Sequence, residues 1–206
     1  MDDAVQPEDL GRMKSFQKIN HFPGMYSLSR KNHLAIHLAR MKKAFIDEYN
    51  FFPKTWLLPA EYTDFSNDMK QNSKFYIVKP KASSQGKGIF LTNSYEYIDH
   101  NSQYVAQRYI MDPYLIDELK FDCRFYVLMT GCSPLRIFLY NEGLARFATE
   151  KFEPPNEENL NNHWMHLTNY AINRKNKKFT VFDERDDCGH KRSLSSVFEV
   201  FKISKH

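Results

Sequence analysis

The spacing of apolar residues predicts one long amphipathic helix early in the chain, followed by a series of short strands. Apolar side chains recur at helical spacing after Ser29, with charged residues between them, at Leu34, Leu38, Met41, Phe45 and Tyr49. We expect this helix to end before residues 51–53, because proline disfavours helical geometry in the residue that precedes it. Short apolar runs predict strands over residues 55–58, 75–78, 89–91 and 104–110, a helical turn over 94–99 and a helix over 193–201. The polar residues 61–73 predict only a helix end and a surface loop.

The most strand-like stretch, residues 121–129, brings charged side chains to one face. Because successive side chains of a strand point to opposite faces, Asp122, Arg124 and Tyr126 share a face. The other face carries Phe121, Cys123, Phe125 and Val127. An acid and an arginine two residues apart can bind a nucleotide and a phosphate together, or can form a cross-strand ion pair, and both interpretations stay open.

Residues 133–149 predict a turn at Ser133-Pro134 and then a hairpin. Strands over residues 136–140 and 144–149 flank Asn141-Glu-Gly143, which has the composition of a hairpin turn. In such a meander Arg146 lies on a strand beside the one that carries Asp122 and Arg124. Residues 166–170 are expected to be extended, and the charged residues 173–191 to form a mobile surface segment.

Residues 79–90 predict a phosphate-binding loop between two strands. Gly86 and Gly88 bracket Lys87, and glycine lets backbone N–H groups converge on phosphate oxygens without a Cβ clash. Lys79, at the end of the first strand, could add a fixed positive charge. A plain lysine-bearing β-hairpin fits the loop equally well. A Walker A loop is excluded because position 88 is not Ser or Thr, and a protein kinase because its other motifs do not occur.

The composition predicts a folded protein with a mild preference for acidic partners. Hydrophobic residues make up 42% and aromatic residues 15% of the 206 residues, and the net charge is +4. The basic residues early in the chain suggest one positive face, although a solvated helix surface has the same pattern. They are Arg12, Lys14, Lys18, Arg30, Lys31, Arg40, Lys42 and Lys43.

The sequence argues against a membrane protein, a disulfide framework and a zinc site. Its three cysteines, Cys123, Cys132 and Cys188, lack Cys-x-x-Cys spacing and predict reduced thiols in an intracellular compartment. The acidic N-terminus does not resemble a signal peptide, and no apolar run approaches the ~20 residues that span a membrane. Residues 87–90 lack the alternating aromatics of an RNA-recognition strand. We therefore expect a soluble cytoplasmic protein that binds neither membrane nor nucleic acid.

An ordered series of motifs runs from about residue 12 to residue 195. It comprises Asn20-His-Phe-Pro-Gly-Met25, Phe52-Pro-Lys-Thr-Trp-Leu-Leu-Pro59, Lys79-Pro80, Gln85-Gly-Lys-Gly-Ile-Phe90, Leu115-Ile-Asp117, Lys120-Phe-Asp-x-Arg124, Pro134-Leu-Arg-Ile-Phe138, Glu142-Gly-Leu-Ala-Arg-Phe-Ala-Thr149 and His166-Leu-Thr-Asn-Tyr-Ala-Ile-Asn173. These motifs closely resemble the tubulin tyrosine ligase-like family, and most of all its polyglutamylase branch.

The resemblance implies an α+β fold of the ATP-grasp type, with antiparallel sheets, flanking helices and an incomplete C-terminal part. Residues 1–60 would form an N-terminal helical, substrate-side segment, residues 61–111 a central subdomain with the glycine-rich hairpin, and residues 112–206 a partial C-terminal subdomain. The implied activity is the ATP-dependent addition of glutamate to glutamate side chains of acidic tubulin tails through an acyl phosphate. Its partners would be tubulin or microtubules and free L-glutamate. Its location would be the cytoskeleton, including the cilium or flagellum and its basal body.

The resemblance also implies a role for individual residues. Arg124 would neutralise phosphate or acyl-phosphate charge, and Arg146, Tyr170 and Lys191 would hold the incoming glutamate, which makes Arg124 and Arg146 the catalytic candidates. ATP would be bound by Lys79, Lys87, Gly88, Gln107, Arg108, Tyr109, Ile110, Lys120, Phe121, Asp122, Thr168 and Asn169.

The family's magnesium ligands have no counterpart in the sequence. In the family they lie on a late strand bearing Glu-x-Asn, preceded by an Asp, and no such strand occurs before His206. ATP and Mg²⁺ are therefore the implied cofactors, but no metal ligand is assigned. The alternative interpretation is a truncated, inactive module that binds ATP, microtubules or both. A nucleic-acid-binding domain ranks last, and glycine as the added amino acid is not excluded.

Overall fold

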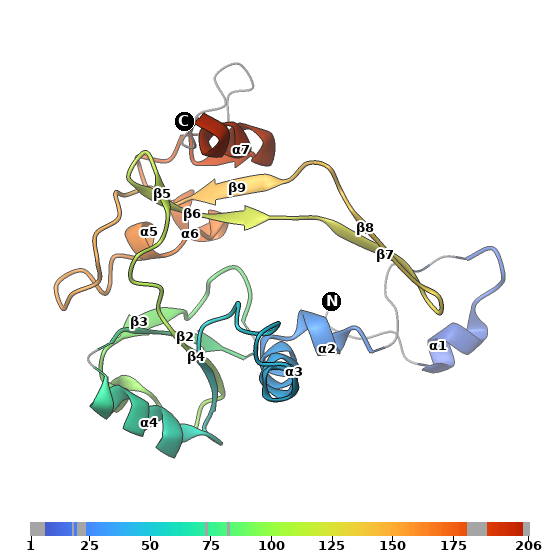
Figure 1. Ribbon diagram of the computed structural model, residues 1–206, viewed down its shortest axis with the longest axis horizontal. Helices are drawn as coiled ribbons and strands as arrows, with labels where there is room; N and C mark the ends of the chain where they lie inside the picture. Colours follow the sequence, from blue (N-terminus) through green and yellow to red (C-terminus); the bar gives the residue numbers. More distant parts are fainter. Residues whose placement is uncertain are drawn as a thin grey trace. The chain divides into compact units, whose positions relative to one another are not determined.

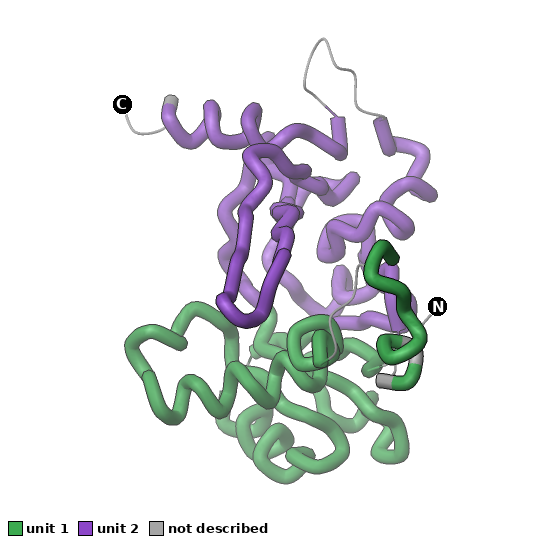
Figure 2. Tube along the Cα trace, turned by 90° about the vertical axis from the view of Figure 1, so that its right-hand side faces the viewer, with its two compact units in different colours: residues 1–82, 92–109 green, residues 83–91, 110–206 purple. Residues whose placement is uncertain are grey.

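A computed structural model describes residues 7–17, 19, 24–72, 74–81, 83–180 and 189–203. The described residues do not include Lys18, residues 20–23 of the first motif, or residues 181–188 of the charged segment with Cys188. The chain divides into two compact units (Figure 2), one of Met1–Ala82 with Thr92–Tyr109 and the other of Ser83–Leu91 with Ile110–His206. No helix in the described ranges is both long enough and apolar enough to cross a membrane.

The first unit is built on an antiparallel sheet whose strands were predicted from the apolar runs. Its order is β1-β4-β2-β3, with β1 at Thr55–Leu58, β4 at Tyr104–Arg108 and β2 at Tyr76–Pro80. Strand β3, Phe90–Thr92, straddles the boundary between the two units. The predicted turn over 94–99 is the 3₁₀ helix η1, Tyr95–Tyr97. These strand and turn predictions are confirmed.

The helices of the first unit differ in part from the prediction (Figure 1). They are α1 at Pro7–Arg12, α2 at Tyr26–Ser29, α3 at Lys31–Ala44 and α4 at Tyr62–Gln71. The long helix α3 is shorter than expected, because Phe45 leaves helical geometry (φ −139°, ψ 76°) and Tyr49 lies in a following turn. Helix α4 replaces the predicted loop over 61–73, and it buries Phe65 and Met69.

A buried carboxylate explains why a polar segment forms helix α4. Asp68 accepts hydrogen bonds from the Arg108 guanidinium at 2.6 and 3.2 Å, the Tyr76 hydroxyl at 2.7 Å and the Lys54 ammonium at 3.1 Å. Burial alone raises the pKa of Asp68, but the hydrogen bonds from Arg108, Tyr76 and Lys54 outweigh it and lower the pKa to about 2. The ring of Tyr76 also packs edge-on against Phe65. Asp68 thus ties helix α4 to strands β2 and β4.

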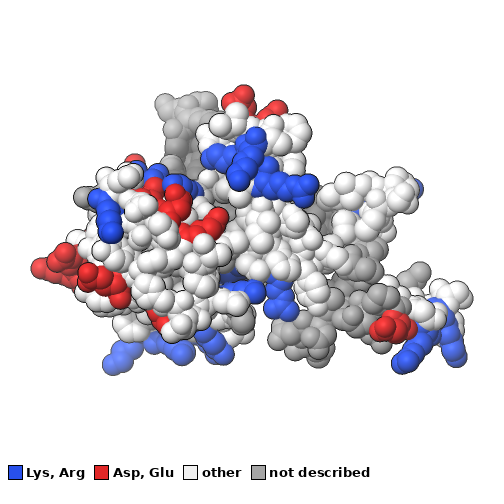
Figure 3. Space-filling view, turned by 90° about the horizontal axis from the view of Figure 1, so that it is seen from below, with Lys and Arg blue, Asp and Glu red and all other residues white. Residues whose placement is uncertain are grey.

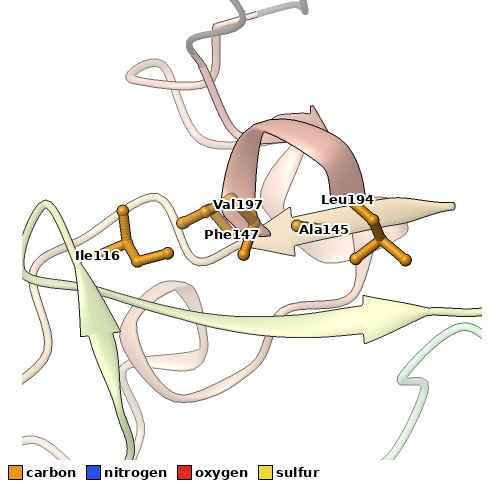
Figure 4. Packing of buried hydrophobic residues seen from close by; sticks show 5 residues of the cluster. All are labelled: Ile116, Ala145, Phe147, Leu194 and Val197. Carbon is orange, nitrogen blue, oxygen red and sulfur yellow. The ribbon is translucent and has the colours of Figure 1, made fainter. Parts of the chain in front are cut away.

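The second unit is built on a sheet of order β10-β9-β6-β5. Strand β6 is Leu119–Arg124, β9 is Leu144–Phe147, β10 is Lys191–Ser193 and β5 is Leu115–Ile116. Helix α7, Leu194–Ile203, confirms the predicted C-terminal helix and packs Leu194 and Val197 against strand β9 (Figure 4). The core cluster consists of Ile116, Ala145, Phe147, Leu194 and Val197.

The predicted hairpin between residues 136–140 and 144–149 is wrong. Strand β7, Val127–Cys132, pairs with β8, Leu135–Leu139, while β9 pairs with β6. Strands β6 and β7 therefore form one side of a long hairpin and β8 and β9 the other, and the hairpin turns at the predicted Ser133-Pro134. The single strand predicted over residues 121–129 is interrupted after Arg124. The ribbon of β7 and β8 exposes most of its apolar side chains.

Residues 141–143 do not form the turn of a hairpin: Gly143 allows close packing, and Glu142 caps a helix. A Cβ on Gly143 would lie 2.4 Å from the Arg124 carbonyl oxygen and 2.5 Å from Leu194, so only glycine allows β9 to start there. The Glu142 carboxylate accepts from the Leu194 backbone N–H at 2.9 Å and from Ser195, and so caps the first turn of helix α7.

Two short helices overlap the ends of residues 166–170, the segment that was expected to be extended. Helix α5 is His163–His166 and α6 is Tyr170–Asn173, which leaves only residues 167–169 extended. His166 is 1% exposed, and its Nε2 lies 3.1 Å from the Asn159 carbonyl oxygen. Burial, together with the nearby charge of Lys120, lowers the pKa of His166 to about 4.

We expect Asp68→Asn to lower the free energy of unfolding by about 3–5 kcal/mol, because Arg108 and Tyr76 would lose their charged acceptor inside the fold. Urea unfolding followed by circular dichroism measures the change. Asp47→Asn, at an exposed position of the same unit, is the matched control and should change it by less than about 0.5 kcal/mol. Equal effects of the two substitutions would contradict this role of Asp68.

His166 should make stability depend on pH in a defined window. The folded state holds this side chain neutral, with a pKa of about 4 against 6.5 in the unfolded chain, so its contribution is complete above pH 6.5 and is lost as the pH falls toward 4. The contribution is at most about 3 kcal/mol. His166→Gln should make the urea midpoint of unfolding less dependent on pH across this window. His163→Gln, at an exposed position of helix α5, should leave that pH dependence unchanged.

Candidate active site

A cavity of about 230 Å³ opens in the second unit, over the sheet of β6, β9 and β10. Three of its described lining residues are the cations Arg124, Arg146 and Lys191, and none is a carboxylate. Such a lining favours an anionic ligand. The others are Tyr126, Leu144, Phe147, Thr168, Tyr170, Asn173, Phe179 and His190.

Arg146 is held in place by a bidentate ion pair. Asp122 and Arg146 are opposite each other across β6 and β9, and the guanidinium donates to the two carboxylate oxygens at 2.7 and 2.5 Å. The Thr168 hydroxyl donates to the same carboxylate at 3.0 Å. The hydrogen bond that Arg146 donates to Asp122, opposed by burial, raises the pKa of Arg146 and keeps it charged. The cross-strand ion pair that the sequence allowed is therefore present, on a side chain that also lines the cavity.

The strand register places the other two cations beside Arg146. Lys191 of β10 lies opposite Arg146, and Arg124 of β6 lies opposite Leu144. The predicted shared face of Asp122, Arg124 and Tyr126 is confirmed, since Arg124 and Tyr126 line the cavity and Asp122 bonds to Arg146. Five candidate site residues thus line the same cavity: Arg124, Arg146, Thr168, Tyr170 and Lys191.

An aromatic wall that the sequence did not reveal closes part of the cavity. Phe179 packs edge-on against Tyr170 at 5.7 Å between ring centroids and stacks on His190 at 5.6 Å. Burial, reinforced by the charge of Arg192, lowers the pKa of His190, so the ring is neutral at pH 7. The sequence offered one sign of this wall, namely Phe179 and His190 within residues 173–191. That charged segment was expected to be mobile surface.

Asn173 is a second residue that the sequence did not identify. It is 1% exposed, and its side-chain oxygen accepts from the Thr149 backbone and hydroxyl, both at 2.9 Å. Its amide nitrogen donates to the Leu167 carbonyl at 2.7 Å and to the Asn169 carbonyl at 3.2 Å. These bonds fix the extended residues 167–169 and so position Thr168 at the cavity.

The glycine-rich loop has a backbone conformation that favours glycine at two positions. Gly86 and Gly88 have φ values of 81° and 68°, and Lys87 and Gly88 are exposed. A Cβ on Gly86 would lie 2.5 Å from Ile172 and 2.9 Å from the Asn169 side chain, so this glycine is needed for close packing within the second unit. The loop thus leaves Lys87 and Gly88 accessible to a ligand.

The other candidate ATP ligands in the second unit have structural contacts of their own. The Lys120 ammonium donates to the His166 carbonyl at 3.0 Å. Phe121 stacks on Phe147 at 5.2 Å and packs against the core cluster, so its side chain points away from the cavity. Asn169 stands at the N-cap position of helix α6 without a side-chain cap hydrogen bond, and its side chain packs beside Gly86. Ile110 is exposed.

Four candidate ATP ligands lie in the first unit. The Lys79 ammonium donates to the Gln107 side chain at 2.9 Å, and Gln107 donates to the Thr55 hydroxyl at 2.9 Å. Burial, with the charge of Lys31, lowers the pKa of Lys79. The Arg108 side chain is bonded to Asp68 and its backbone N–H donates to the Lys54 carbonyl at 3.0 Å, and Tyr109 is buried.

The described residues do not fit a magnesium site. No group of three or more His, Cys, Asp or Glu side chains in the described ranges could hold a metal ion. Asp122, the partner of the cavity residue Arg146, has both oxygens bonded to Arg146 or Thr168.

Comparison with known proteins agrees with the motifs. The tubulin-tyrosine ligase family profile matches residues 10–204. A probable beta-tubulin polyglutamylase of Tetrahymena thermophila is 58% identical over the whole chain, which covers 18% of that protein. Tubulin polyglutamylase TTLL13 of Mus musculus is 50% identical, with 25% of its length covered, and TTLL7 of Xenopus tropicalis is 43% identical, with 23% covered. The chain thus spans about a fifth to a quarter of the length of these relatives. With the family profile matching nearly all of its residues, the chain belongs to the tubulin-tyrosine ligase family.

Proposed function

We propose that this chain carries the amino-acid-binding and nucleotide-binding residues of a tubulin polyglutamylase. The proposed reaction adds glutamate, with ATP hydrolysis, to glutamate side chains of tubulin tails. The observation that carries the proposal is the cationic cavity around the fixed guanidinium of Arg146. The similarity to proteins named tubulin polyglutamylases supports the choice of glutamate and tubulin. A role on tubulin would locate the protein at the cytoskeleton, including that of the cilium.

The cavity suits the incoming glutamate because that amino acid carries two carboxylates. Asp122 takes up two donors of the Arg146 guanidinium, which orients the rest of the group. Lys191 and Arg124 supply further positive charge at fixed positions on β10 and β6. Tyr170 and the neutral wall of Phe179 and His190 would pack against the aliphatic part of the ligand.

ATP would convert the acceptor carboxylate into an acyl phosphate, which the glutamate amine attacks with release of phosphate. Lys79, Lys87 and the backbone at Gly88 would bind phosphate oxygens. Arg124 would stabilise the negative charge that develops during transfer. Residues 107–110 would hold the base with their backbone and apolar side chains, while the Arg108 side chain stays bonded to Asp68. Lys120, Asp122, Thr168 and Asn169 would contribute from the second unit, with Phe121 supporting them from the core.

We expect Arg146→Ala to weaken L-glutamate binding about tenfold or more, because the cavity loses its fixed guanidinium and Asp122 loses its partner. Isothermal titration calorimetry in the presence of a non-hydrolysable ATP analogue measures the affinity. Arg136→Ala, at an exposed position of strand β8, is the matched control and should bind normally. Unchanged glutamate affinity in Arg146→Ala would place the amino acid elsewhere.

The activity itself is tested by incorporation of labelled glutamate into purified tubulin with Mg-ATP, by this chain and by Lys79→Ala. We expect ATP-dependent incorporation that Lys79→Ala lowers at least about 100-fold, the scale of losing one preorganised electrostatic contact. Labelled glycine should not be incorporated. If nothing is incorporated while ATP and glutamate still raise the unfolding temperature, the alternative of a binding module is correct for this chain.

A further inference from the structure

Positive charge alone does not explain how the cavity would select one amino acid. Figure 3 shows Lys and Arg side chains in several separate groups on the face that it draws, with Asp and Glu gathered in groups of their own. Charge therefore attracts small anions to many places on the surface. Selection of one ligand needs, in addition, a directional hydrogen bond that the wrong ligand cannot make.

Among the neutral polar residues of the cavity, His190 keeps a ring nitrogen for a ligand. Thr168 donates to Asp122, and the Asn173 amide is bonded to backbone groups through both its oxygen and its nitrogen. His190 also lines the cavity, but its ring is hydrogen-bonded only through Nδ1. Its Nε2 has no hydrogen-bond partner among the residues that the structure describes.

The hydrogen bonds at Nδ1 assign the proton of the His190 ring. The Thr180 backbone N–H donates to Nδ1 at 3.1 Å, and the Thr180 hydroxyl lies 3.0 Å from the same atom. A backbone N–H can only donate, so Nδ1 has to accept and the neutral ring carries its proton on Nε2. Burial, with the charge of Arg192, lowers the pKa of His190 and so also favours the neutral ring. Nε2 is therefore a hydrogen-bond donor.

The imidazole is held in one orientation. Its ring stacks on Phe179 with 27° between the two planes, while Thr180 holds Nδ1. The His190 carbonyl accepts from the Phe147 backbone N–H at 2.9 Å, which ties this residue to the end of strand β9. Thr180 is not among the described residues that line the cavity, so Nε2, at the other edge of the ring, is the nitrogen left for a ligand.

We propose that His190 is a specificity-determining residue whose Nε2–H donates a hydrogen bond to the side-chain carboxylate of the bound glutamate. This inference rests on the proposed function, which places glutamate in the cavity. The packed rings of Tyr170 and Phe179 suit the methylene groups of glutamate, and the side-chain carboxylate follows these groups. An amino acid that lacks this carboxylate would leave the N–H unpaired in a partly buried position, which costs affinity.

The same tautomer excludes His190 as the base that takes a proton from the amine of glutamate. Such a base needs an unprotonated nitrogen that faces the ligand. The unprotonated nitrogen of His190 is Nδ1, which Thr180 occupies. His190 thus acts by binding and not by proton transfer.

The test is isothermal titration calorimetry of the whole 206-residue chain with L-glutamate, in the presence of a non-hydrolysable ATP analogue. In His190→Asn the amide oxygen can still accept from Thr180, but no donor reaches the position of Nε2. In His190→Gln the longer side chain places an amide N–H near that position. We expect His190→Asn to weaken glutamate binding about tenfold and His190→Gln to weaken it less than about threefold. His163→Asn, at an exposed position of helix α5, is the control and should bind normally.

L-2-Aminobutyrate, which is glutamate without its side-chain carboxylate, shows which carboxylate His190 contacts. Its weaker binding is measured by competition with L-glutamate. Its affinity should change less than about twofold in His190→Asn, because it has no group for the Nε2–H. Equal losses for the two ligands would overturn the proposal, since they would indicate a structural role or a contact with the α-carboxylate. Normal glutamate binding by His190→Asn would overturn it as well.

Should His190→Asn unfold, nitrogen NMR of the imidazole in the unaltered chain replaces it. The Nε2–H signal of His190 should move on addition of L-glutamate and stay in place with L-2-aminobutyrate, and a signal that ignores both ligands would overturn the proposal. If the unaltered chain binds no L-glutamate, the proposed function fails together with this inference. If it binds L-glutamate and His190→Asn binds equally well, this inference alone fails.

Discussion

The ion pair between Asp122 and Arg146 is the interaction on which the candidate active site depends. It forms because the register of β6 and β9 sets these two residues opposite each other. Arg146 gains a fixed orientation, and Thr168 is drawn to the same carboxylate. A shift of one residue in this register would turn Arg146 toward the core cluster and would also move Lys191, which is paired with Arg146 through β10.

That register is in turn fixed by close packing and a helix cap at the start of β9. Gly143 allows the start of β9 to approach the Arg124 carbonyl, and Leu194 of helix α7 fills the space beside it. Glu142 caps the same helix, whose Leu194 and Val197 cover Ala145 and Phe147. The apolar face of β9 is thereby committed to the core, which leaves the opposite face, with Arg146, to the cavity.

The sequence predicted the strands and the cationic residues better than it predicted their connections. Period-two alternation identified the face of Asp122, Arg124 and Tyr126, because the direction of side chains along a strand is a local property. The prediction from turn composition failed at Asn141-Glu-Gly143, since the same residues suit a tight turn, a close backbone approach or a helix cap. Only the residues packed against them, Arg124 and Leu194, decide among these. Helix α4 was missed for a similar reason: Asp68 reads as a surface residue until Arg108, 40 positions later, is placed beside it.

The geometry of the Asp122–Arg146 pair fits the role proposed for the cavity. Asp122 neutralises part of the charge of Arg146 and holds its guanidinium in one planar orientation. The remaining donors of that guanidinium can then meet a carboxylate only in a defined geometry. Lys191 and Arg124 add positive charge at fixed positions on β10 and β6. Such a site suits a reacting amino acid, whose amine has to be presented in one position, better than an anion that needs charge alone.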